Sequence, residues 1–252
     1  MPDPLVRYER RGGVGTITLD SPANRNALSS PLRRQFVDHL AAATRDDGVR
    51  VIVLDHAGPV FCAGKDLKET DPAPAPELPA IILAIWDSPK PVVAALAGPA
   101  RAGGVGIAAA CDVVVAADTV SFALTEVRLG VVPAVLTAVL RRRMSAPAAH
   151  ELFLTGAGFD ATRAAEIGLV NRVVPGDMLA ATAVEYATML RAGAPGALAE
   201  TKALLRRGTG RPLADELAVL DEIGARSLAG AEAREGIRAF AERRPPQWTV
   251  GG

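Results

Sequence analysis

The stretch from Pro91 to Ala117 constrains the fold more than any other part of this chain. It is almost entirely apolar, and only Arg101 and Asp112 carry a charge within it. Such a stretch either crosses a membrane or lies in a protein core, because it has little favourable interaction with water. Pro99, four glycines and the central arginine argue against a membrane-spanning helix. We therefore expect this stretch to form the core of a globular protein.

Short apolar runs and helical segments alternate along the first two thirds of the chain. Strand-like patterns cover Leu5–Arg10, Val14–Asp20, Arg50–His56, Pro91–Leu96, Asp112–Ala117 and Leu169–Val174, and the first two predict a hairpin. Helices are predicted from Ser29 to about Arg45 and over Gly103–Ala110, Ala134–Arg143, Ala146–Leu154, Ala161–Ile167, Gly176–Arg191, Pro195–Arg207, Leu213–Leu228 and Ala231–Arg243. The segment Asp71–Pro79 holds four prolines and is interpreted as a mobile flap. The recurrence of strand, loop, helix and strand favours an α/β layer architecture.

The overall charge excludes several classes of partner. Lys and Arg together number 28, as do Asp and Glu, so nucleic acid and anionic membranes are not expected as main partners. Cys62 and Cys111 lie in apolar surroundings, and no cysteine or histidine has metal-ligand spacing, so neither a disulfide framework nor a metal site is expected. The N-terminal residues lack the pattern of a secretion signal. We expect a cytoplasmic protein.

Two glycine-rich segments resemble nucleotide-binding motifs. Gly58–Asp66 differs from a phosphate-binding P-loop, because five residues separate its glycines and Asp66 replaces the required Ser or Thr. Gly104–Ala109 fits the G-x-G-x-x-A pattern of dinucleotide-binding proteins. Only six residues separate Gly106 from Val113, whereas a crossover between parallel strands usually needs at least ~10–12. A nucleotide-dependent dehydrogenase stays open as an alternative.

The start of the helix predicted at Gly103 offers a different use for these glycines. Unpaired N–H groups and the helix dipole favour negative charge at such a position. With a second amide from the Gly64-Lys65-Asp66 loop opposite, the pair would form an oxyanion hole for a carbonyl that gains charge during reaction. Close packing of helices through small residues explains the same composition equally well.

Glu126 is the candidate acid/base. It lies in a mostly apolar run that ends at Pro133, and partial loss of hydration would raise its pKa and suit it to proton transfer near neutral pH. The alternative is a structural glutamate paired with Arg128. The charged stretch Glu235–Arg244 is typical of a solvated helix face, although its arginines are also candidates to meet a ligand phosphate.

Several segments, taken in order, resemble the enoyl-CoA hydratase/isomerase (crotonase) family. The segments are Asn24–Leu28, Phe61–Glu69, Gly103–Asp112, Phe122–Pro133, Leu154–Val170 and Glu235–Arg244. The resemblance implies a spiral of ββα units with a helical C-terminal region: residues 1–192 as the core with the acyl-CoA site, and residues 193–252 for trimerisation. It also implies homotrimers or homohexamers, and acyl-CoA thioester substrates, in which CoA is part of the substrate and no separate cofactor is needed.

The same resemblance implies roles for individual residues. The two oxyanion amides fall on Lys65 and Gly103, and Glu126 matches the second of the two glutamates used by the hydratase branch. The first falls on Gly106, so the two-glutamate mechanism does not transfer intact. The expected substrate-binding residues are Lys65, Asp66, Leu67, Lys68, Gly103, Phe240 and Arg243.

Three reactions need only one glutamate: hydration of a 2-enoyl thioester, isomerisation of a 3-enoyl thioester, and carbon–carbon cleavage or decarboxylation. The run from Leu124 to Ala134 looks like the methylglutaconyl-CoA hydratase-like branch, and Ala134 stands where isomerases that act on dienes place an extra acid. We therefore expect an enoyl-CoA hydratase. An isomerase and a non-catalytic acyl-CoA binder remain alternatives, and acyl-chain preference is expected to depend on residues 70–80 and on Trp86.

Overall fold

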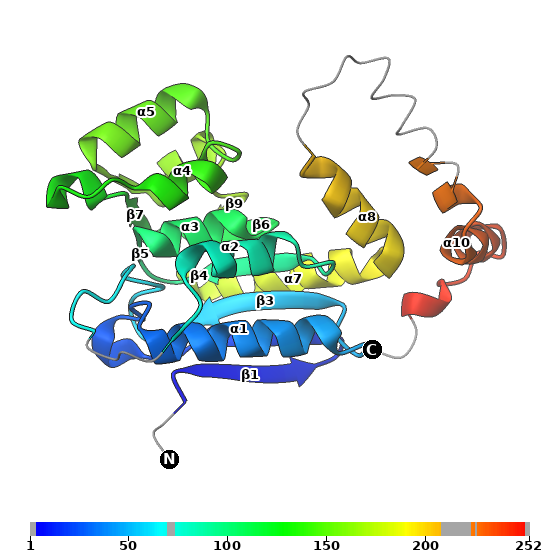
Figure 1. The fold of residues 1–252 in the computed structure, drawn as a ribbon. Coiled ribbons are helices and arrows are strands. Elements are labelled where there is room, and N and C mark those ends of the chain that lie inside the picture. Colours follow the sequence, from blue (N-terminus) through cyan, green and yellow to red (C-terminus); the bar gives the residue numbers. More distant parts are fainter. Residues whose placement is uncertain (1–3, 70–73, 208–222, 225, 250–252) are drawn as a thin grey trace.

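A six-stranded sheet forms the centre of the molecule, with the order β1-β2-β3-β4-β6-β9 (Figure 1). The computed structural model describes residues 4–69, 74–207, 223–224 and 226–249. β1 pairs antiparallel with β2, and the later neighbours are parallel. The strands are β1 (Val6–Arg11), β2 (Val14–Leu19), β3 (Val51–His56), β4 (Val92–Leu96), β6 (Val113–Ala117) and β9 (Arg172–Val174).

Both faces of the sheet are covered, which explains why its central strands are apolar throughout. In β3, Ile52 and Leu54 point into the larger core, beneath α1 (Ser30–Arg45), α2 (Leu78–Trp86) and α3 (Gly103–Ala110). Val51 and Val53 point to the opposite face, where α7 (Leu179–Ala192) packs. Successive side chains of a strand alternate between faces, so one apolar run supplies two cores.

A second, smaller sheet extends the layered core. It consists of β5 (Ala100–Arg101), β7 (Ser121–Ala123) and β8 (Gly158–Asp160) in that order. The chain around it forms α4 (Ala134–Leu140), α5 (Ala146–Thr155), α6 (Ala161–Glu166) and the 3-10 turn η2 (Glu126–Leu129). Two other 3-10 turns precede α1 and α7: η1 (Pro22–Asn24) and η3 (Gly176–Met178). β5 runs parallel to β7, so the carboxyl ends of both strands lie at the same edge.

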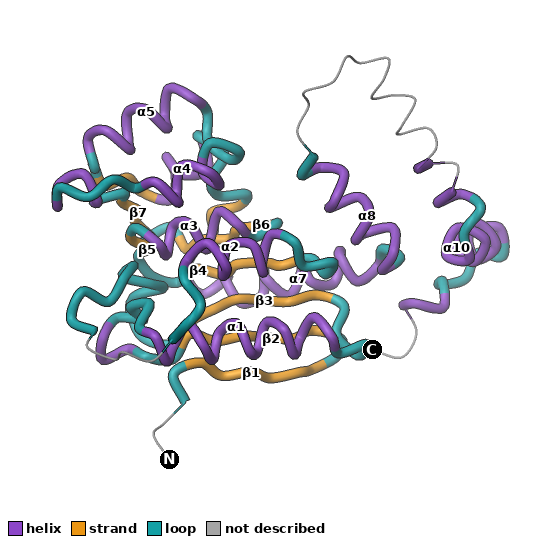
Figure 2. The backbone as a smooth tube through the Cα atoms, in the orientation of Figure 1, coloured by secondary structure: helices purple, strands orange, loops and turns teal. Residues whose placement is uncertain are grey.

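The C-terminal helices lie to one side of the sheet (Figures 1 and 2). They are α8 (Pro195–Leu205) and α10 (Ala231–Ala241), followed by η4 (Gln247–Thr249). Arg50 connects this region to the sheet, because its guanidinium donates hydrogen bonds to the carbonyl oxygens of Gly193 and Trp248, each at 2.8 Å. Whether residues 193–252 form a separate trimerisation unit stays a prediction.

Most predicted elements are confirmed, among them the hairpin and the helix Gly103–Ala110. Several predictions need correction. Residues 71–73 of the predicted flap lie outside the described residues, and Pro79 lies in the first turn of α2, where the missing N–H of proline leaves no hydrogen bond unmade. The helix predicted from Gly176 begins as the 3-10 turn η3 and becomes α7 only at Leu179. α4 ends at Leu140, before the predicted Arg143, and β9 covers only Arg172–Val174 of the predicted strand. The helix predicted over 213–228 falls mostly outside the described residues.

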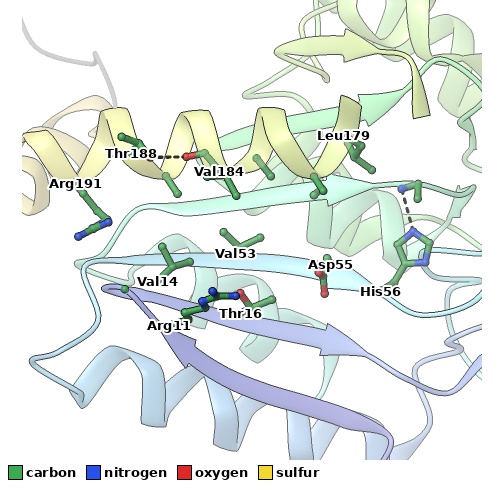
Figure 3. Close-up of a pocket in the computed structure, with 16 residues that line it drawn as sticks. Arg11, Val14, Thr16, Val53, Asp55, His56, Leu179, Val184, Thr188 and Arg191 are labelled. Carbon is green, nitrogen blue, oxygen red and sulfur yellow. Dashed lines mark hydrogen bonds between the residues drawn. The ribbon is translucent and has the colours of Figure 1, made fainter. Parts of the chain in front are cut away.

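A cavity of about 580 Å³ lies between α7 and strands β1–β4 on the second face of the sheet (Figure 3). Arg11 and Arg191 lie at one end of it and His56 at the other, with Val53 and Val184 between them. None of the predicted site residues lines it. Within the described ranges, no helix has both the length and the apolar character needed to cross a membrane.

Candidate active site

Two loops that carry the predicted amides approach each other closely. A Cβ atom at Gly64 would lie 2.9 Å from the Cβ of Ala102, 3.2 Å from the carbonyl oxygen of Arg101 and 3.5 Å from the amide nitrogen of Gly103. Gly64 also has φ of +89°, which favours glycine. Ala102 has a φ of +47°, unusual for a residue with a side chain, at the point where the chain turns into α3. Both features serve to bring the two loops together.

The amide nitrogens of Lys65 and Gly103 have no hydrogen-bond acceptor among the described residues, although both loops are otherwise well bonded. Leu28 donates its N–H to the carbonyl oxygen of Gly64 at 2.8 Å and pairs with Lys65 in an isolated parallel bridge. Ala102 donates its N–H to the carbonyl oxygen of Ala123 at 3.0 Å. Two donors on firmly held backbone are therefore available to a ligand oxygen.

Glu126 lies beside these donors because of the pairing of β5 with β7. Gly103 follows the end of β5 by two residues, and Glu126 follows the end of β7 by three. Glu126 is half-buried at the start of η2, and its Oε2 atom is buried without a hydrogen-bond partner within the described chain. Burial raises the pKa of this carboxyl above its ordinary value of 4.5, although a backbone hydrogen bond partly opposes the shift.

The alternative pairing of Glu126 with Arg128 does not occur. Arg128 is exposed and donates from Nε to the carbonyl oxygen of Thr155 at 3.0 Å. Among the described residues the carboxylate is thus left without a cation, as expected for a group that acts on a ligand rather than one that stabilises a turn.

Four of the predicted residues line one cavity of about 410 Å³: Lys65, Leu67, Gly103 and Glu126. The others do not. Asp66 instead shapes the loop, because its Oδ1 accepts a hydrogen bond from the N–H of Lys68 at 2.9 Å. Phe240 is on α10 and Arg243 follows it; α10 lies across the molecule from the α4 side of the cavity (Figure 1). The structure does not bring these two residues to the cavity of their own chain.

Leu136, in the apolar wall of this cavity, occupies the space beside Gly106, the position where the resemblance places the first of the two hydratase glutamates. A Cβ at Gly106 would lie 2.6 Å from Cδ2 of Leu136, which lines the cavity and is 2 % exposed. Gly104 is equally crowded, because a Cβ there would lie 2.7 Å from the Cβ of Cys62. Both glycines are inside α3 and not in a loop before it, so they serve close packing and do not form a dinucleotide-binding turn.

Sequence reasoning missed two charged residues of the cavity and wrongly assigned an aromatic one to it. Arg33 and Glu77 line the cavity, whereas Trp86 does not and instead packs beneath the guanidinium of Arg206, 4.3 Å from the ring centre. A signal for Arg33 exists: the apolar residues Leu32 and Phe36 mark the buried face of α1, and Arg33 lies three residues before Phe36. For Glu77 we find no comparable signal.

This arrangement has a defined chemical capacity. Two unpaired amides can hold an oxygen that becomes negative, and a partly desolvated carboxylate beside them can accept or return a proton. A carbonyl compound with a reactive carbon near Glu126 is the type of ligand that would use both features.

Comparison with known proteins agrees with this geometry. The family model described as enoyl-CoA hydratase/isomerase matches residues 9–251. The chain is 34 % identical to enoyl-CoA hydratase EchA19 of Mycobacterium tuberculosis, covering 98 % of this chain and 96 % of that protein. It is 35 % identical to the mevalonyl-coenzyme A hydratase sidH of Aspergillus fumigatus, covering 92 % and 90 %. A crystal structure of an enoyl-CoA hydratase from Mycobacterium smegmatis superposes with a TM-score of 0.89 at 32 % identity, covering 98 % of this chain and all of that one. The chain belongs to the enoyl-CoA hydratase/isomerase family and has the crotonase fold.

Proposed function

We propose that this protein is an enoyl-CoA hydratase that adds water across the 2,3 double bond of an enoyl-CoA thioester. The thioester oxygen binds between the amides of Lys65 and Gly103. Glu126 removes a proton from the water that attacks the β-carbon, and the two amides stabilise the enolate that forms. The α-carbon then receives the proton held by Glu126, directly or through a water molecule, which returns Glu126 to the carboxylate form.

The single observation that carries this proposal is the convergence, on one cavity, of two amides and one carboxylate for which the described part of the chain supplies neither acceptor nor cation. Membership of the family and the names of the two hydratase relatives support the same reaction class. The missing glutamate at Gly106 is compatible with it, because Glu126 alone can handle the proton of the attacking water.

Replacement of Glu126 by Gln tests the proposal. We expect a loss of about 10²–10⁴ in kcat with substrate binding largely kept, because glutamine preserves the shape but cannot accept a proton. The loss of absorbance of the conjugated enoyl thioester measures the rate, and Glu9→Gln, at an exposed position of β1, is the matched control. An undiminished rate in Glu126→Gln would show that another group is the base. CoA-thioester binding by the wild type without consumption of any thioester would instead identify a non-catalytic binder.

Isomerisation of a 3-enoyl to a 2-enoyl thioester is the second candidate. The apolar contact of Gly106 with Leu136 favours it, because a site with one acid can move a proton from the α- to the γ-carbon without binding a water molecule. Incubation of matched 2-enoyl and 3-enoyl thioesters, with the products identified by mass, separates the two reactions. Hydration adds the mass of one water molecule, and isomerisation leaves the mass unchanged.

We further propose that the protein is a homotrimer or homohexamer in which α10 of one subunit serves the cavity of another. Phe240 is 87 % exposed and Ile237, three residues before it on α10, is 57 % exposed, so one face of this helix presents an apolar surface that a partner would cover. Sedimentation velocity would give the assembly size. Phe240→Ala should raise KM if this residue contacts the substrate of a neighbouring subunit, and should leave KM unchanged if it does not.

A further inference from the structure

A buried arginine lies beside the proposed oxyanion hole. Arg33 belongs to the first turns of α1, is only 6 % exposed, and lines the same cavity as Glu126. A buried guanidinium is unfavourable unless it is paired and hydrogen-bonded. Nη1 donates to the carbonyl oxygen of Leu28 at 2.7 Å, and Nη2 donates to Oγ of Ser30 at 3.0 Å. These contacts fix the guanidinium in one orientation.

Two carboxylates approach Arg33 from two different points of the chain. Oε2 of Glu69 lies 3.6 Å from Nη1, and Oε1 of Glu77 lies 3.7 Å from Nη2. Glu69 follows Lys65 by four residues, and its Oε1 also accepts a hydrogen bond from the backbone N–H of Ser30. Glu77 is the N-cap residue of α2. One cation therefore connects the start of α1 with the segment that follows Lys65 and with the start of α2.

Through these contacts Arg33 supports the backbone that carries each of the two amides. For the Lys65 amide the link is Leu28: its carbonyl oxygen accepts a hydrogen bond from Arg33, its N–H donates to the carbonyl oxygen of Gly64, and it pairs with Lys65. For the Gly103 amide, the side chains of Leu28 and Leu78 enclose the glycine: a Cβ there would lie 3.0 Å from Cδ1 of Leu28 and 3.3 Å from Cδ2 of Leu78. Loss of Arg33 would release both supports together.

We propose that Arg33 is a positioning residue that sets the separation of the Lys65 and Gly103 amides. It does not touch the reacting atoms; it acts through Leu28 on one loop and through Glu69 and Glu77 on the segments that flank the cavity. The inference rests on the proposed function, because it matters only if the two amides hold a thioester oxygen. A shift of about 1 Å in one amide is enough to cost about 10²-fold in rate.

The test uses Arg33→Met, which keeps an unbranched apolar stem but removes the guanidinium and its donors, and Arg33→Lys, which keeps the charge but not the planar fork of donors. Arg45→Met, at an exposed position near the end of the same helix, is the control. The probe is cinnamoyl-CoA, a conjugated thioester whose absorption band moves to longer wavelength when hydrogen bonds polarise its carbonyl. Binding, band shift, kcat and KM are measured on the purified full-length chain.

We expect Arg33→Met to bind the probe within about threefold of wild type, to lose most of the band shift, and to have kcat reduced by about 10–10². Arg33→Lys should recover part of the band shift and part of kcat, and Arg45→Met should match wild type. If Arg33→Met does not fold, as judged by circular dichroism, Arg33→Lys and Glu69→Gln decide in its place, since both should show a reduced shift. A full band shift and wild-type kcat in the folded Arg33 and Glu69 variants would overturn the inference. A wild-type protein that neither shifts the band nor consumes enoyl thioesters would overturn the proposed function itself, and this inference with it.

Discussion

The contact between Gly106 and Leu136 makes a quantitative prediction about the wall of the cavity. The perturbation is Gly106→Ala, alone and combined with Leu136→Ala. The new methyl carbon would lie 2.6 Å from Cδ2 of Leu136 and 3.5 Å from Cδ1 of Ile82. Carbon atoms normally approach to about 3.5–4.0 Å, so the leucine has to retreat by roughly 1 Å. Leu136 is 2 % exposed and Ile82 is 8 % exposed, which leaves little space for that movement.

The expected free energies follow from this geometry. Overpacking of a core costs ~1–3 kcal/mol, and replacement of a helical glycine by alanine returns ~0.5–1 kcal/mol, so Gly106→Ala should lower the free energy of unfolding by about 1 kcal/mol. Leu136→Ala alone should lower it by ~2–5 kcal/mol through the cavity it leaves. In the double variant the overlap is gone, so its free energy of unfolding should be ~1–3 kcal/mol higher than the sum of the two single effects predicts.

Urea unfolding at a fixed protein concentration measures all four proteins of this cycle. Gly104→Ala is the control, because its Cβ would meet the Cβ and carbonyl oxygen of Cys62, at 2.7 and 2.8 Å, and not Leu136. Gly104→Ala should change the free energy of unfolding by the same amount with and without Leu136→Ala. If the effects of Gly106→Ala and Leu136→Ala add within about 0.5 kcal/mol, Leu136 does not fill the position and the account of the missing glutamate is wrong.

Three further predictions concern ionisable groups. Because burial raises the pKa of Glu126 and the base must be ionised, kcat/KM should fall as the pH drops through a value above 4.5, and this acid limb should be absent from the residual activity of Glu126→Gln. Burial raises the pKa of Cys62 and of Cys111 to about 12, so neither thiol should react with a disulfide reagent at neutral pH until the protein is unfolded by denaturant. Hydrogen bonds from Arg244 and Arg238 lower the pKa of Glu235 from 4.5 to about 2. Its contribution to stability should therefore be complete above pH 4.5 and disappear as the pH falls through about 2, and Glu235→Gln should flatten the pH dependence of hydrogen exchange in α10 over this range.

Local patterns were sufficient to predict several parts of the site. The apolar run before Asp112 and the glycines at 103 and 104 predict the strand and helix that carry one amide, since strand and helix periods are properties of neighbouring residues. Glu126 is predicted for a similar reason, because an acid within an apolar run loses part of its hydration when the run is buried. Both predictions depend on residues close together in the chain.

Contacts between distant segments escaped the same reasoning. The prolines around residue 76 predicted a flap that extends to Pro79, but Pro79 is in the first turn of α2, where tertiary packing of Ile81 and Ile85 stabilises a helix. Arg33 was missed because its partners Glu69 and Glu77 lie 36 and 44 residues away, taken from their residue numbers. The helical pattern indicates that Arg33 lies near the buried face of α1, but it does not identify the carboxylates that pair with it.

The amino-acid sequence by itself determined the α/β class of the fold and indicated candidate groups for the site, because apolar periodicity and residue type are local properties that do not depend on the rest of the chain. Only the tertiary structure decided that Lys65 and Gly103 line the same cavity, that no cation of the described residues pairs with Glu126, and that Leu136 occupies the space beside Gly106. Hydrogen-bond satisfaction, desolvation and steric exclusion arise from atoms that folding brings together across the sequence, and these decide which of the named groups are free to act.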